Sequence, residues 1–260
     1  MAYEAEKEKF GQLLEIMDQL RAGCPWDKCQ THETLRHLTI EETYELSDAI
    51  LSNDMNGLKG ELGDLMLHLV FYSKIASESK HFTILNVLDT IIEKLIIRHP
   101  HIFGDVKVLD AREVKDNWEK IKIQKEGKKS VLSGVPQSLP ALVKAYRMQE
   151  KASGVGFDWE APHQVWDKVR EELEELRYEA EHNSDLQLIE AEFGDLIFAL
   201  VNFARFIKVN PEDALEKTNR KFRKRFMYLE EKTRERGLSL DNMSLAEMDV
   251  YWEEAKKLGY

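Results

Sequence analysis

A short acidic pattern that occurs twice inside apolar helical segments constrains the fold of this chain most strongly. EETYE at 41–45 is followed by ELGD at 61–64, and EELEE at 171–175 is followed by EFGD at 192–195. In each copy the second pair of acids interrupts a segment that otherwise has the pattern of a buried helix. Carboxylates in such places are unfavourable unless a positive group joins them. Each copy therefore predicts a bound cation between helices.

The composition favours a helical, acidic protein. Of its 260 residues, 43% are hydrophobic and 33% are charged, whereas 13 are glycine and 6 are proline, which favours long helices over a many-stranded sheet. The net charge of −11 argues against binding to nucleic acid or to an anionic membrane. The sequence has neither an apolar signal core at its start nor an apolar run as long as a membrane span, so we expect a cytoplasmic protein. Cys24 and Cys29 are expected to be reduced thiols there.

The same helical plan occurs in both halves of the chain. Residues 126–140 collect Gly, Ser, Lys and Pro and are the best candidate for a linker. We therefore expect an all-α fold of two repeated helical-bundle domains, at 1–125 and 141–260. Punctuation by Gly and Pro predicts loops at 24–34 and 154–162. Apolar periodicity predicts helices over about 4–21, 33–52, 57–77, 83–98, 110–125, 139–153, 165–182, 186–207, 211–236 and 243–259.

The acids of the second copy have the spacing of a metal site. Residues three or four positions apart share a helix face, and a tight turn at 183–185 favours an antiparallel pair of helices whose acids converge. Oxygen donors without His or Cys suit Mg²⁺, with Mn²⁺ as the other choice. Glu171 lies one residue off this face, and Glu171 or Glu172 is the candidate to accept a proton from water. The predicted ligands are four carboxylates: Glu172, Glu175, Glu192 and Asp195.

Cationic and aromatic residues near these acids suggest a phosphorylated substrate, because Mg²⁺ commonly meets substrate phosphates. Lys221 and Arg225 share one face of a basic helix, and Lys168 lies one turn before Glu172. Trp252 is a candidate to stack on a base or ribose. Simpler alternatives stay open: the acids of EELEE as a solvated helix face, the basic run as a surface helix, and the tryptophan as core.

These motifs resemble the MazG family of all-α nucleoside triphosphate pyrophosphohydrolases, whose mark is EExxE followed by ExxD on the next helix. GCPWD at 23–27, RHPHIFGD at 98–105 and the segment 131–159 also resemble that family. The resemblance implies hydrolysis of ribo- and deoxyribonucleoside triphosphates, ATP included, to the monophosphate and pyrophosphate. It also implies dependence on Mg²⁺ and a homodimer. It assigns metal binding and nucleotide contacts to the residues predicted above.

The resemblance further implies that the second domain carries most or all of the activity. The first domain lacks a counterpart of the basic run KFRKRF, which agrees with a weakly active or inactive domain. It nevertheless keeps every acid of the motif, so its activity is left open. The acids that it keeps are Glu41, Glu42, Glu45, Glu61 and Asp64.

Three other functions remain as alternatives. The first is a narrower pyrophosphohydrolase of the same superfamily, such as a dUTPase, a dCTPase or the phosphoribosyl-ATP enzyme. The second is a di-iron carboxylate bundle, which needs two buried Glu-x-x-His pairs; the pairs present here begin at Glu78 and Glu179 and lie in polar stretches. The third is a non-catalytic helical partner protein, which does not explain acids inside apolar helices. His68, one turn after Asp64, is expected to be a core histidine.

Overall fold

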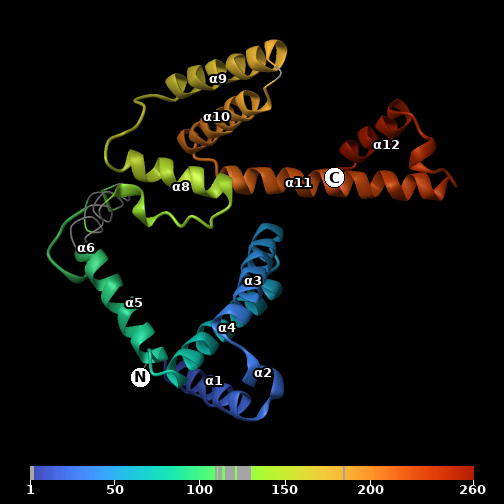
Figure 1. Cartoon of the computed structure of the whole chain (residues 1–260). Helices are drawn as coiled ribbons and strands as arrows, with labels where there is room; N and C mark the ends of the chain where they lie inside the picture. The colour runs from blue at the N-terminus through green and yellow to red at the C-terminus, as the bar shows by residue number, and fades with distance from the viewer. Residues whose placement is uncertain (1–2, 109, 111–112, 115–120, 122–129, 184) are drawn as a thin grey trace. The chain divides into compact units, whose positions relative to one another are not determined.

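The computed structural model describes residues 3–108, 110, 113–114, 121, 130–183 and 185–260, and all the regular elements in these ranges are helical (Figure 1). The prediction of an all-α fold is thus confirmed for the described residues. The chain divides into two compact units, Met1–Val108 and Leu109–Tyr260. The helix predicted over 110–125 lies largely outside the described residues and stays a prediction. Of the predicted linker at 126–140, residues 130–140 are described and include a short 3-10 helix, η1 (Val131–Gly134); its role as a linker also stays a prediction.

The first unit is built on a pair of long helices joined by a two-residue turn. Asn53 adopts a left-handed conformation with φ of 56° at the end of the first of these helices, and Asp54 caps the next by accepting hydrogen bonds from the backbone N–H groups of Asn56 and Gly57. The short turn places the two helices, α3 and α4, side by side (Figure 1). The helices of this unit are α1 (Glu4–Gly23), α2 (Pro25–Cys29), α3 (His32–Ser52), α4 (Met55–Glu78), α5 (Ile84–Arg98) and α6 (Pro100–Phe103).

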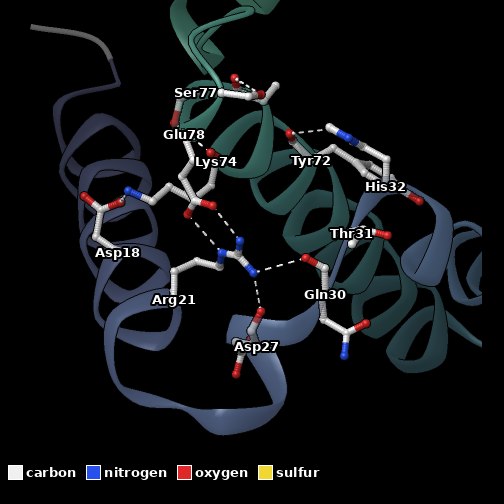
Figure 2. A network of polar contacts seen from close by, with 12 residues as sticks. Asp18, Arg21, Asp27, Gln30, Thr31, His32, Tyr72, Lys74, Ser77 and Glu78 are labelled. Carbon is white, nitrogen blue, oxygen red and sulfur yellow. Dashed lines mark hydrogen bonds and ion pairs between the residues drawn. The ribbon is translucent and has the colours of Figure 1, made fainter.

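The prediction of a continuous loop over 24–34 was wrong, because α2 lies within it. Pro25 stands at the first helical position, where its missing N–H is tolerated. Figure 2 shows how Arg21 of α1 holds this short helix: its guanidinium donates to the backbone carbonyls of Asp27 and Gln30 and to both carboxylate oxygens of Glu78 on α4, at 3.0 and 2.5 Å. Below this network α1, α3 and α4 form the core, whose fully buried members are Met17, Leu35, Val70 and Phe71.

The second unit repeats this plan with a longer C-terminal part. The turn at 183–185 is short, and α9 and α10 pack side by side along their length (Figure 1). Helix α8 packs on α10, while α11 contacts α8 at one end and α12 at the other. The helices of this unit are α8 (Ala141–Ser153), α9 (Pro162–His182), α10 (Leu186–Phe206), α11 (Pro211–Glu235) and α12 (Leu245–Lys257).

Helices α4 and α10 were expected to be buried nearly all round, and this expectation was wrong for the single chain. Leu69 on α4 is 59% exposed, and Phe193 and Leu200 on α10 are 54% and 43% exposed. The reason for α10 is that, among the described helices, it packs mainly against α9 and α8 and less against α11, so part of its apolar surface stays exposed. Within the described residues, none of the helices combines the length and the apolar character needed to cross a membrane.

Candidate active site

The acids of the second unit converge as their spacing predicts. Glu172 on α9 and Glu192 and Asp195 on α10 each bring one carboxylate oxygen to within 4.8 Å of the other two. The side chain of Glu172 is only 9% exposed, whereas Asp195 lies at the solvent edge. Three oxygens that face one another with no cation between them repel, so this arrangement fits a divalent metal.

Glu175 lies outside this trio but responds to its charge. Its residue is exposed, yet partial desolvation of the carboxyl raises its pKa above the ordinary value. The negative charge of Glu172 raises the pKa further, and Lys168 partly opposes the effect. Glu175 is not among the three acids whose oxygens converge, so its role as a metal ligand stays a prediction.

Lys168 connects the trio to Glu171. Its ammonium group donates hydrogen bonds of 2.7 Å to an oxygen of Glu171 and of 2.7 Å to an oxygen of Glu172. These two bonds raise the pKa of Lys168 above its usual value, so it remains a cation at any physiological pH. The structure thus places a permanent positive charge directly beside the acids, one turn before Glu172 as expected.

A cavity of about 650 Å³ opens beside the acids, within the usual size range of ligand pockets. Helices α8, α9 and α10 and the loop between α8 and α9 contribute its walls. Most of the lining is apolar or aromatic, and the polar exceptions gather near the acids and at the end of α10. The lining residues are Leu132, Met148, Gln149, Ala152, Gly156, Phe157, Asp158, Trp159, Lys168, Glu172, Asp195, Phe198, Ala199, Asn202 and Arg205.

An ion pair holds the loop that carries Phe157 and Trp159, two of the three aromatic residues of this lining. Both terminal nitrogens of Arg205 on α10 donate to the carboxylate of Asp158, one of them at 2.9 Å, and Nε donates to Asn202 at 3.1 Å. Burial alone raises the pKa of Asp158, but the hydrogen bonds from Arg205 and Ser153 outweigh it and leave the pKa below its ordinary value. The loop 157–159 is therefore fixed to the central helix by a charged clamp.

The predicted nucleotide-binding residues on α11 and α12 form a group of their own. The guanidinium of Arg225 lies 5.8 Å from the centre of the Trp252 ring, and its Nε donates to the backbone carbonyl of Tyr260 at 2.8 Å. Phe222 packs against the same tryptophan with ring centres 5.1 Å apart. Lys221 is exposed on this helix. The residues that line the cavity do not include this group, so its contact with a nucleotide stays a prediction.

The first unit contains the equivalent acid cluster. Glu42, Glu45 and Glu61 bring carboxylate oxygens to within 4.8 Å of one another. Burial, followed by the charges of Asp64, Glu45 and Glu61, raises the pKa of Glu42. Oε2 of Glu61 is buried without a hydrogen-bond partner among the described residues. A buried carboxylate oxygen without a partner is unfavourable, so this site also fits a cation.

His68 is buried, as expected of a core histidine, with 7% of its surface exposed. Its ring packs edge-on against Tyr72 with centres 6.4 Å apart, and burial lowers its pKa. Among the described residues, Nδ1 of this ring has no hydrogen-bond partner.

Sequence reasoning missed the cavity and three residues that shape it: Gln149, Asp158 and Arg205. Gln149 occurs in an ordinary amphipathic helix, and the clamp joins residues 47 positions apart. The loop 154–162 was recognised by its glycines and by its placement ahead of the acidic helix, but nothing in it indicated which helix would hold it.

Comparison with known proteins agrees with this geometry. Residues 30–103 and 160–228 each match the MazG nucleotide pyrophosphohydrolase domain, and both acid clusters lie inside these stretches. The chain belongs to the MazG family. A "Nucleoside triphosphate pyrophosphohydrolase/pyrophosphatase MazG" of Thermotoga maritima is 47% identical over 251 residues, which are 95% of each chain.

Two further relatives of this MazG-family chain show that the similarity extends over both units. A "Nucleoside triphosphate pyrophosphohydrolase" of Escherichia coli K12 is 43% identical over 256 residues, 96% of this chain and 97% of that one. The "Uncharacterized protein YabN" of Bacillus subtilis is 47% identical over 256 residues, which make up 96% of this chain and 52% of that protein.

Proposed function

We propose that the second unit hydrolyses ribo- and deoxyribonucleoside triphosphates, including ATP, to the nucleoside monophosphate and pyrophosphate with Mg²⁺ as the cofactor. The observation that carries this proposal is the convergence of Glu172, Glu192 and Asp195 beside a ligand-sized cavity. Membership of a pyrophosphohydrolase family supports it, as do the names of the bacterial relatives.

The side chains of the site have distinct tasks in this reaction. Glu172, Glu175, Glu192 and Asp195 would hold Mg²⁺, which supplies Lewis acidity and neutralises charge on phosphate oxygens. Glu171 or Glu172 accepts a proton from the attacking water. Lys168 pairs with Glu171 and Glu172 and adds positive charge near the phosphates. On α11, Lys221 and Arg225 bind the phosphate chain, and Trp252 stacks on the sugar or base.

We also infer that the working protein is a homodimer. The uncovered side of α10 carries Phe193 and Leu200, and Leu173 on α9 is 50% exposed. Exposed apolar surface of this kind marks an interaction site, and a second copy of the chain is the partner that the family resemblance implies. Light scattering on the purified protein should give twice the monomer mass of 30.3 kDa.

A pyrophosphate-release assay tests the activity. We expect release from a panel of ribo- and deoxyribonucleotides with Mg²⁺ and none with a chelator, and equal yields of monophosphate and pyrophosphate. Release from one nucleotide alone would favour the narrower enzymes. The matched control is Glu174→Gln, because Glu174 is an exposed residue of α9 that pairs with Arg177; it should keep full activity. Failure of every nucleotide at every divalent metal would refute the proposal.

A further inference from the structure

One buried polar atom of a residue that lines the cavity has no hydrogen-bond partner in the described part of the chain. Gln149 on α8 is only 7% exposed, and its Nε2 donates to the backbone carbonyl of Phe198 on α10 at 2.9 Å. Its Oε1 is buried and lacks a hydrogen bond to any described residue. Buried polar groups are nearly always hydrogen-bonded, so an orphaned acceptor in a cavity wall points to a ligand that donates.

The orientation of this side chain follows from its one bond. A carbonyl oxygen only accepts, so the group of Gln149 that faces Phe198 must be the amide NH₂. The amide oxygen then has to lie on the other side of the group and is an acceptor only. Because Gln149 lines the cavity and its NH₂ group is already bonded to Phe198, the oxygen is the polar atom of this side chain that is left for a ligand.

The rest of the lining suits a flat aromatic ligand. Phe157 is 82% exposed and Trp159 is 46% exposed, although both are large aromatic side chains. The clamp between Arg205 and Asp158 holds the loop that carries them. Aromatic faces that are held in place at the rim of a cavity are the platforms on which bases stack.

We propose that this cavity binds the nucleobase of the substrate and that Oε1 of Gln149 accepts a hydrogen bond from an N–H group on the edge of the base. This inference rests on the proposed function and names its specificity pocket. Glu172 and Asp195 line the same cavity, so a base seated there leaves the phosphates beside the acids.

A single acceptor explains a broad substrate range. Adenine and cytosine present an exocyclic amino group, and guanine, thymine and uracil present a ring N–H, so each common base satisfies Gln149. A purine without any such donor leaves the acceptor unpaired. The pocket therefore tolerates the common bases and selects against a base that has only C–H on that edge.

The test compares ATP with purine riboside 5′-triphosphate, which has a hydrogen in place of the amino group. In the wild-type protein we expect kcat/KM to be about tenfold lower for the analogue, as one hydrogen bond to a buried acceptor allows. In Gln149→Met, which keeps the volume and removes the acceptor, the ratio of the two substrates should fall to about one. Gln187→Met changes an exposed glutamine of α10 outside the cavity and should keep the wild-type ratio.

Calorimetric Kd values for both nucleotides, measured with Ca²⁺ in place of Mg²⁺, make the test independent of turnover. Equal Kd and equal kcat/KM in the wild-type protein would overturn the inference, whether or not Gln149→Met folds. A lower melting temperature of Gln149→Met with an unchanged ratio would also overturn it, because that result assigns Gln149 a structural role only. Binding with the expected ratio but no pyrophosphate release would refute the proposed function and leave the base pocket standing.

Discussion

The two units place the same acids on the same pair of helices, yet they differ in what lies next to those acids. Glu61 and Glu192 lie 131 residues apart, and the same offset relates Asp64 to Asp195. One turn beyond the aspartate, the first unit has His68 where the second has Ala199. Three residues further on, the fully buried Phe71 stands in place of Asn202, which lines the cavity.

The residues on this helix face and on the helix packed against it differ in the contacts that they make. In the first unit Lys74 on α4 pairs with Asp18 on α1 at 2.6 Å (Figure 2). At the equivalent positions the second unit has Arg205, which holds the aromatic loop, and Gln149, which has its acceptor free. The acids alone therefore do not define a nucleotide site, and we expect the two units to differ in function.

The largest effect should come from neutralising the aspartate that ends the ELGD or EFGD motif in each unit. Asp195→Asn removes a charge from the trio in the second unit and should lower kcat by at least ~100-fold, because the site loses affinity for its cation and positions it poorly. Asp64→Asn makes the same change in the first unit and should lower kcat by less than about twofold. The measurement is steady-state pyrophosphate release from ATP at saturating Mg²⁺.

Melting temperatures measured without metal distinguish a variant that has lost its cation site from a variant that no longer folds. Converging carboxylates repel one another, so Asp195→Asn should melt at the same temperature as the wild-type protein or higher. A large loss of activity in Asp64→Asn with intact folding would show that the first unit takes part in catalysis, and the contrast drawn above would then be wrong.

The next largest effect should come from exchanging the residues at one position where the two units differ, His68 and Ala199. Ala199→His places the side chain of the first unit in the cavity of the second, where overpacking should lower kcat/KM for ATP by about 5- to 100-fold. Ala199→Ser adds one atom and serves as the matched control. The reciprocal change His68→Ala should lower the melting temperature and leave kcat/KM unchanged.

Unchanged kcat/KM in Ala199→His, with its fold intact, would show that substrate does not use the cavity. Increased turnover in His68→Ala would show instead that the first unit is an enzyme blocked by its own core.

The helices and the acid clusters were predictable from sequence because their causes are local. Apolar periodicity indicates a helix wherever it lies in the chain, and spacings of three and four residues put Glu192 and Asp195 on one face. A two- or three-residue turn then forces neighbouring helices to pair, which brings Glu172 to the same place.

The pocket was not predictable because its causes are distant in sequence. Whether Gln149 keeps a free acceptor depends on which carbonyl of α10 it meets, and that contact spans 49 residues. The contact between Asp158 and Arg205 likewise joins residues that are far apart in the sequence. The burial of α10 was overestimated for a related reason, since apolar character in a sequence does not tell whether the chain itself or a partner covers a helix.

The smallest expected effect is the loss of stability at acidic pH that comes from two ion pairs, Arg205 with Asp158 and Arg21 with Glu78. Hydrogen bonds from Arg205 and Ser153 lower the pKa of Asp158 in spite of its burial, and the hydrogen bond from Arg21 lowers that of Glu78. A lowered folded-state pKa means that the unfolded chain binds protons first as the pH falls. The stabilisation is therefore complete above the unfolded pKa, near 4, and is lost as the pH falls through the folded value. Between about pH 5 and pH 3, the melting temperatures of Asp158→Asn and Glu78→Gln should each fall less than that of the wild-type protein. For Asp158, the stabilisation that the wild-type protein loses over this range is roughly 1 kcal/mol or less.

Of these two ion pairs, only the one between Arg205 and Asp158 lines the cavity, so the two substitutions should differ in their effect on KM. Asp158→Asn loosens the loop that carries Phe157 and Trp159, so KM for ATP should rise about three- to tenfold. Glu78→Gln loosens α2 in the first unit and should leave KM within about twofold. Equal rises in KM would mean that the Arg21 network also supports substrate binding, and the contrast between the two ion pairs would then be wrong.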